Sequence, residues 1–324
     1  METLLISILA VALSFNIGAN NAAASMATAY GSNTISKLAS VSLIFIFVFL
    51  GAAFGGEKVV NTVGKEIVSV DLSAHKLGIK FIFLILALPV VCIFIANLLK
   101  IPIATTHIVV CTMIGIGLAL KEINLFKVTE IVIWWIATPV ILWFSNYLIG
   151  KHLYLKIINW LASHSDEERI NKILKYSLVI SGCFIAFFAG SNNSANAAGP
   201  IVAINLVSAS DGALLAGFFM ALGALLFGGR ILETVAKEIT DICLIRAISV
   251  HLTGGILLFV ASFYGIPISL AEIVTAGIIG FSCASTGFSQ TLKNTSVSSI
   301  LSFWIMGPIS CVVISYIIAE SLLR

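Results

Sequence analysis

Charged residues are scarce in this sequence: only 10% of its 324 residues are Asp, Glu, Lys or Arg, while 59% are hydrophobic. A soluble domain carries about 25% charged residues, because its surface faces water. The scarcity excludes a soluble globular protein and predicts an all-α, polytopic membrane protein. The sequence also lacks a basic block and any interleaving of basic with aromatic residues, which argues against nucleic acid as a partner.

Metal-ligand motifs are missing as well. The six cysteines occur singly, mostly inside apolar runs, where cysteine behaves as a small hydrophobic residue. We therefore expect neither a disulfide nor a metal site, and no cofactor. The sequence also lacks the nucleophile, base and metal clusters of an enzyme, since His107 follows two threonines and has no carboxylate alongside. The protein is accordingly predicted not to be an enzyme.

Long apolar segments dominate what is present. A helix needs about 17–25 apolar residues to cross a bilayer. The one sizeable polar stretch, residues 151–176, holds five of the 18 basic residues and separates a first unit, residues 1–150, from a second, residues 177–324. The ten predicted spans are residues 3–20, 38–55, 79–99, 103–120, 128–150, 176–190, 208–227, 242–264, 266–283 and 297–321.

The two units repeat each other. GANNAAA at residues 18–24 lies on GSNNSAN at residues 190–196 when the chain is shifted by 172 positions, and IPIATTHIVV from Ile101 lies on IPISLAEIVT from Ile266 at an offset of 165. Each unit has about five predicted spans. Because this number is odd, the second copy enters the membrane from the opposite face. The sequence thus predicts two inverted-topology repeats.

Both Asn motifs place uncharged hydrogen-bonding groups inside apolar segments. We expect each helix to break at Gly18 or Gly190, where the freed backbone faces protein or a water-filled cavity. The helix start after each break would offer unpaired N–H groups, and asparagine adds side-chain donors, so the two breaks form one central anion site. The alternative is that these residues only join helices. The expected substrate-binding residues are Asn20, Asn21, Ala22, Thr105, Thr106, Asn192, Asn193, Ser194 and Asn196.

The segment PIATTH, which begins at Pro102, adds hydroxyls and an imidazole to this site. His107 can bond an anion or carry a proton. The second unit reads PISLAE instead, so Glu272 stands in the place of His107 and the site is asymmetric. Because ionisable groups at membrane depth are functional candidates, ion coupling is assigned to His107, Glu57 and Glu272. Threonines bonded to their own helix and a satisfied histidine are the alternative.

These motifs resemble the inorganic phosphate transporter family (PiT), which carries a duplicated GAND-x-ANA signature and a PVSTTH segment after each copy. The family's aspartate is Asn21 in one copy here and Asn193 in the other, and the second Thr-Thr-His is absent. The chain looks most like the family's shorter members, which act as sulfate permeases. The resemblance implies a symporter that imports a small inorganic oxyanion, sulfate above all, with H⁺ or Na⁺ as the coupling ion. A sodium-coupled phosphate transporter and an anion channel are the alternatives.

The positive-inside rule orients the predicted spans in the cytoplasmic membrane. It places the linker at residues 151–176 in the cytoplasm and both chain termini outside. The expected partners are the lipid bilayer and sulfate or phosphate as substrate, and a homodimer stays open beside a monomer.

Cysteine labelling tests this orientation. With the native cysteines replaced, the variant Ser163→Cys should react with a membrane-impermeant maleimide in inside-out vesicles and not in intact cells, because the linker faces the cytoplasm. Labelling only from the outside would contradict the orientation.

Overall fold

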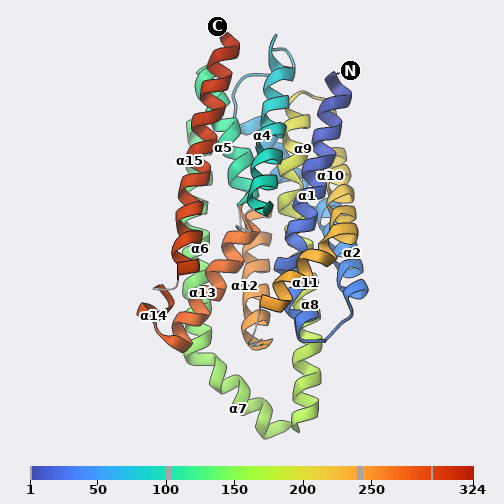
Figure 1. Cartoon of the computed structure of the whole chain (residues 1–324), viewed down its shortest axis with the longest axis vertical. Helices are drawn as coiled ribbons and strands as arrows, with labels where there is room; N and C mark the ends of the chain where they lie inside the picture. Colours follow the sequence, from blue (N-terminus) through green and yellow to red (C-terminus); the bar gives the residue numbers. More distant parts are fainter. Residues whose placement is uncertain (1, 99–103, 239–243, 293–294) are drawn as a thin grey trace.

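The structure is a computed structural model of the whole chain and describes residues 2–98, 104–238, 244–292 and 295–324. Within these ranges the chain is almost entirely helical, and the only strand-like pairing is an isolated antiparallel bridge between Val68 and Ile123. The helices, drawn in Figure 1, are α1 (Glu2–Gly31), α2 (Lys37–Gly55), α3 (Glu57–Asn61), α4 (Gly78–Leu98), α5 (Thr105–Leu120), α6 (Leu125–Leu148), α7 (Tyr154–His164), α8 (Glu167–Asn193), α9 (Ala195–Ala203), α10 (Ala209–Gly223), α11 (Gly229–Glu238), α12 (Leu244–Phe263), α13 (Leu270–Thr286), α14 (Phe288–Leu292) and α15 (Thr295–Leu323), with π-helical stretches at Thr62–Glu66, Ile149–Leu153 and Ala224–Gly228.

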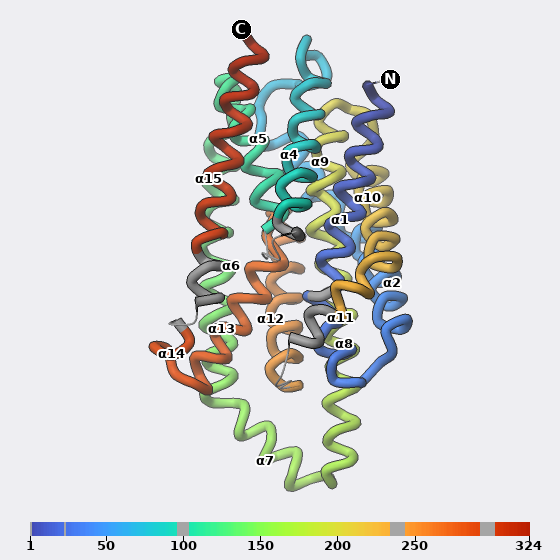
Figure 2. Tube along the Cα trace, viewed as in Figure 1, coloured from blue at the N-terminus to red at the C-terminus, as the bar shows by residue number. Residues whose placement is uncertain are grey.

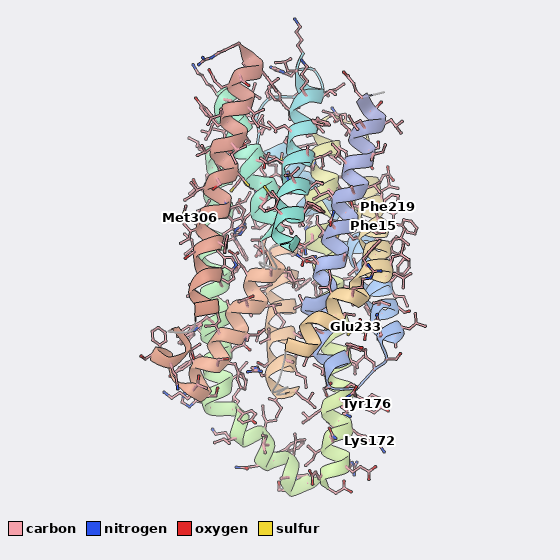
Figure 3. The ribbon with its side chains drawn as sticks, in the orientation of Figure 1. Phe15, Lys172, Tyr176, Phe219, Glu233 and Met306 are labelled. Atoms are coloured by element: carbon pink, nitrogen blue, oxygen red, sulfur yellow. The ribbon has the colours of Figure 1, made fainter. Side chains whose placement is uncertain are left out.

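Eight helical segments of the described chain are long and apolar enough to cross a membrane. Large apolar side chains cover the outside of the bundle, as Figure 3 shows for Met306, which is 60% exposed. Charged side chains such as Lys172 lie near the end formed by α7 (Figure 3). The protein is therefore a multi-pass membrane protein with its apolar surface turned to lipid.

Two helical hairpins, α4 with α5 and α12 with α13, each pair a long helix with a shorter one. α5 and α13 have only 16 and 17 residues, about 24 and 26 Å at the usual helical rise, against a hydrocarbon core of about 30 Å. α4 and α5 open toward one end of the bundle, since the Ser69 amide before α4 donates to the Glu122 carbonyl after α5 at 3.0 Å. α12 and α13 open toward the opposite end (Figure 1). Of the four spans predicted here, those at residues 79–99 and 242–264 correspond to helices that are long and apolar enough to cross a membrane, Gly78–Ile95 and Leu244–Phe263. Those at residues 103–120 and 266–283 correspond to the shorter helices α5 and α13, and residues 99–103 and 242–243 lie outside the described ranges.

Both chain ends lie at one end of the molecule, and α7 lies across the other (Figure 1). Within the predicted linker at residues 151–176, α7 ends at His164 and α8 begins at Glu167. Asp166 sets this start: its carboxylate accepts a hydrogen bond from the Arg169 amide at 3.2 Å, which satisfies one of the free N–H groups of the first turn. Ser36, Asn124, Ser208 and Ser269 cap α2, α6, α10 and α13 in the same way.

The turn between α12 and α13 is written in the sequence YGIPIS. Gly265 adopts φ +72°, a conformation that side-chain-bearing residues rarely take. Its amide donates to Ser262 O at 3.0 Å, and the Ile266 amide donates to Ala261 O at 2.8 Å, which is the Schellman arrangement of a helix end. Pro267 then prevents the helix from continuing. The chain thus leaves the helix inside the bundle without losing its terminal backbone hydrogen bonds.

The Asn motifs do not break their helices as predicted. α1 runs unbroken through residues 18–24, and only Ser194 separates α8 from α9, with its amide still bonded to Gly190 O at 3.2 Å. Gly18 and Gly190 instead allow two helix backbones to touch: an added methyl group at either would overlap a backbone carbonyl of the facing helix, at Met220 or at Val48. Because glycine has no side chain, Gly18 and Gly190 allow close helix packing rather than a helix break.

Close packing at Gly18 should govern stability. Gly18→Ala should destabilise the fold by about 1–3 kcal/mol, because the methyl forces α1 away from α10. Gly307→Ala on α15 is the matched control, since an added methyl there meets no atom within 4 Å. Thermal unfolding in detergent measures both; equal transition temperatures for the two variants would contradict the packing role.

Candidate functional site

The start of α5 and the end of α12 lie near mid-height of the bundle (Figure 2). Buried polar side chains gather there. They come from both hairpins and from the helices packed around them, α1, α8 and α9. Isolated polar groups are costly in such a place, so their hydrogen bonds indicate what each one does. The buried site candidates on these elements, called the central cluster below, are Asn21, Thr105, Thr106, His107, Asn192, Asn193, Ser194, Asn196 and Glu272. Direct contacts join Thr106 to Asn193 and Asn196, and His107 to Glu272.

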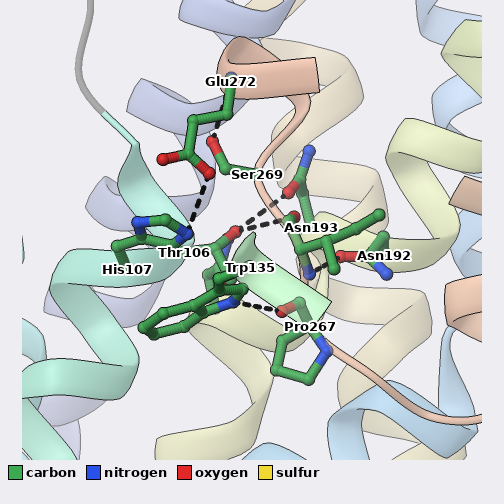
Figure 4. Close-up of polar contacts among 10 residues, drawn as sticks. Thr106, His107, Trp135, Asn192, Asn193, Pro267, Ser269 and Glu272 are labelled. Carbon is green, nitrogen blue, oxygen red and sulfur yellow. Dashed lines mark hydrogen bonds and ion pairs between the residues drawn. The ribbon is translucent and has the colours of Figure 1, made fainter. Parts of the chain in front are cut away.

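Thr106 joins three elements. Its hydroxyl lies 3.3 Å from Asn193 Oδ1 on α8 and 3.2 Å from the carbonyl of Ile268 before α13, and it accepts a hydrogen bond from Asn196 Nδ2 at 3.1 Å (Figure 4). One hydroxyl proton serves two acceptors, so each receives a shared bond. Thr106 therefore ties the first hairpin to the second and to the α8–α9 junction.

Asn192 holds the non-helical backbone between α12 and α13. Its Nδ2 donates to Ile266 O at 2.9 Å and to Ser262 Oγ at 3.2 Å, and its Oδ1 accepts from the Ile268 amide at 2.9 Å. A carboxamide suits this position because it presents a donor and an acceptor to a backbone N–H and C=O that water cannot reach. The role of Asn192 in the structure is to pair this turn.

His107 and Glu272 face each other in the first turns of α5 and α13. Nε2 of the imidazole lies 3.0 Å from Oε2 of the carboxylate, and both side chains are buried (Figure 4). The distance is that of an ion pair, but the two groups are not aligned as a hydrogen bond, and neither imidazole nitrogen has another partner. The Trp135 ring stacks on the imidazole with centroids 3.9 Å apart, while its Nε1 donates to Pro267 O at 2.8 Å.

Three amide atoms of the cluster have no partner within the protein: Nδ2 of Asn21, Nδ2 of Asn193 and Oδ1 of Asn196. The orientation of Asn193 and Asn196 is assigned from Thr106, which bonds the other end of each amide. A buried polar atom without a partner costs about 1–3 kcal/mol. The cluster is thus unsatisfied as it stands and suits a ligand that accepts two N–H bonds.

The structure gathers most of the predicted site residues but not all of them. Glu57 is exposed at the start of α3, so its assignment to ion coupling is withdrawn. Asn20 is only half-buried. The Ala22 methyl faces Gly228, where an added Cβ would lie 2.7 Å from it.

Sequence reasoning missed the groups that hold the second hairpin in place. Ser262 and the carbonyls of Ile266, Pro267 and Ile268 are hydrogen-bonded by the cluster, and Lys58 donates to the carbonyl of Phe263, at the negative end of α12, at 3.1 Å. The signal was present in the sequence as the repeated IPI segments at Ile101 and Ile266 and as the Trp-Ile pair at Trp135, which recurs at Trp304. The pairing of these blocks across the bundle could not be read from the chain.

Comparison with known proteins agrees with this architecture. The profile described as "Phosphate transporter family" matches residues 17–315. The chain belongs to the phosphate transporter family. Its fold is that of a solved structure named the sodium-dependent phosphate transporter, with a TM-score of 0.82, 22% identity and coverage of 99% of both chains.

Two relatives of this transporter carry different substrate names. The sulfate permease CysP of Bacillus subtilis is 34% identical over 95% of this chain and 85% of its own length. A candidate phosphate permease of Methanocaldococcus jannaschii is 27% identical over 94% of this chain and 93% of its own. The family and these relatives are transporters rather than enzymes. The resemblance stated from the sequence motifs is therefore confirmed.

The hydrogen bonds divide the asparagines of this transporter into two kinds. Asn192→Ala should lower the unfolding temperature in the absence of ligand, because the Ile268 amide and Ile266 carbonyl lose their partner, at a cost of about 1–3 kcal/mol per group. Asn193→Ala is the matched control. It removes a donor that has no partner, and Thr106 keeps the Ile268 carbonyl, so the temperature should change little. Equal losses in both variants would contradict this division.

Proposed function

We propose that this protein is a symporter that imports a small inorganic oxyanion, preferentially sulfate, across the cytoplasmic membrane. The observation that carries the proposal is that two buried donors, Asn21 Nδ2 and Asn193 Nδ2, have no partner within the protein. These residues stand at matching positions of the two Asn motifs. An oxyanion that accepts both bonds removes the cost of burying them.

Protonation favours sulfate over phosphate at such a site. The two anions have the same shape, but phosphate keeps at least one P–OH at neutral pH, and this proton needs an acceptor. Sulfate only accepts. A carboxylate near the anion would pair with P–OH and repel sulfate; here the two positions carry amides instead of the family's aspartates. The preference follows from leaving a polar group of the wrong anion unpaired.

A specific observation favours phosphate as the second candidate. Asn196 Oδ1 is a buried acceptor without a partner, so it suits a P–OH group. Glu272, the other buried acceptor of the cluster, already lies against His107. Rotation of the Asn196 amide would turn its free atom into a third donor, with the Thr106 hydroxyl donating to it, and would restore the preference for sulfate.

Inverted repeats and a fixed orientation complete the proposal. The close contacts support the repeat, because Gly18 on Met220 and Gly190 on Val48 are related by the same shift of 172 that aligns the Asn motifs. The basic residues of the linker favour a cytoplasmic position for α7, with both termini outside. An anion channel is the alternative to a symporter. A transport assay distinguishes them, because only a symporter should show saturable flux that follows the gradient of a coupling ion.

Competition in proteoliposomes tests the substrate. Unlabelled sulfate should block labelled sulfate uptake at lower concentration than phosphate does, because the site is rich in donors. The double variant Asn21→Asp with Asn193→Asp should weaken sulfate binding by about 10- to 100-fold and shift the preference toward phosphate. Asn171→Asp, the same change at an exposed position of α8, should leave both unchanged. Stronger inhibition by phosphate in the wild type would overturn the sulfate assignment.

A further inference from the structure

Buried ionisable groups are few in this protein. Apart from cysteines, the described residues include only three buried side chains that titrate: His107, Glu272 and His251. Two of the three lie 3.0 Å apart in the central cluster. They come from different hairpins, and they occupy corresponding positions of the repeated segments that start at Ile101 and Ile266.

We propose that His107 and Glu272 together form one proton-binding site that couples proton uptake to oxyanion binding. This inference rests on the proposed oxyanion transport and adds the coupling ion and the groups that hold it. Neither residue acts alone, because the imidazole and the carboxylate are only 3.0 Å apart, so the charge on one group acts directly on the protonation of the other.

Net charge gives the direction of the coupling. With one proton between them the pair is neutral, whichever residue carries it. Loss of that proton leaves a buried carboxylate that repels an anion, while a second proton makes the pair cationic and attracts one. Thr106, the neighbour of His107, contacts both Asn193 and Asn196, so the pair adjoins the oxyanion site through adjacent residues of one helical turn. Each added proton therefore strengthens oxyanion binding, and by reciprocity a bound oxyanion raises the proton affinity of the pair.

The surroundings leave this coupling to the pair. α6 presents the Trp135 ring, and α1, α8 and α9 present amides and hydroxyls rather than charges, because no Lys, Arg or Asp is among the buried described side chains. Apart from the pair, the buried titratable groups described in α5, in α13 and in the elements packed on them are Cys111 on α5, Cys283 on α13, Cys311 on α15 and His251 on α12.

The position of the pair also links protonation to the hairpins. His107 belongs to the hairpin that opens toward the termini, and Glu272 to the one that opens toward α7. The Trp135 indole holds both sides, since its ring covers the imidazole and its N–H bonds the Pro267 carbonyl two residues before the α13 cap. A change in proton number therefore changes the attraction between the two hairpins at the point where they meet.

Sulfate affinity as a function of pH tests the inference. For the wild type, purified in detergent at constant sodium, the affinity should fall as pH rises, by at most about tenfold per pH unit if one proton is taken up per anion. The double variant His107→Gln with Glu272→Gln keeps no group at this site that exchanges a proton, so its affinity should be almost independent of pH. Glu57→Gln, the same change on exposed α3, and His251→Gln, at the third buried ionisable residue, should keep the wild-type slope.

Infrared difference spectroscopy supplies a readout that needs no ligand. A protonated-carboxyl band should appear on acidification of the wild type, shift in His107→Gln and vanish in Glu272→Gln. A wild-type pH slope in the double variant His107→Gln with Glu272→Gln, or a slope lost only in His251→Gln, overturns the inference even if sulfate binds well. The proposed function fails separately if the wild type binds neither sulfate nor phosphate while the carboxyl band still titrates.

Discussion

Between Phe263 and Leu270 the backbone leaves the helix in the interior of the bundle, and every part of the central cluster depends on how that stretch is paired. Asn192 bonds the backbone of Ile266 and Ile268, and Thr106 and Trp135 take two further carbonyls. In a membrane interior such groups have no water to turn to. The polar residues that look like a binding motif in the sequence are therefore in part the hydrogen-bond partners of a broken backbone.

Close backbone contacts between the long helices hold the residues of the central cluster in place. Gly18 and Gly190 bring α1 onto α10 and α8 onto α2 with backbone against backbone, so that Asn21 and Asn193 lie inside the bundle only a few residues from a helix contact. With these helices held, the amides that remain unpartnered stay where they are buried. Because these helices are packed rigidly, the buried amide donors cannot move to find other partners, and the free-energy cost of leaving them unsatisfied persists.

The two halves of the chain contribute similar asparagines to the central cluster but different ionisable residues. The Asn motifs are similar in both halves and supply donors, whereas His107 and Glu272 occupy corresponding places with different chemistry. Two histidines or two carboxylates facing each other at 3.0 Å would repel when charged, but an imidazole and a carboxylate can share a proton. The asymmetry seen in the sequence as the replacement of Thr-Thr-His thus becomes, in the structure, a contact between the two halves.

Composition, internal repeats and motifs in the sequence by themselves determined that this is a helical membrane protein of the phosphate transporter family, and they named most of the buried cluster. These features can be read from short segments of the sequence, because every membrane-spanning helix must be apolar where it contacts lipid. The two hairpins were not predicted because α4 and α12 are as apolar and as long as membrane-crossing helices. Only the YGIP segment after α12 indicates a turn in the sequence. Helix breaks were expected at Gly18 and Gly190 because glycine permits both a break and a close contact, and the facing helix decides which occurs. Glu57 is no longer assigned to ion coupling, because the structure shows that its side chain is exposed. His107 and Glu272 are far apart in the sequence, and only the packing of the two hairpins brings them into contact.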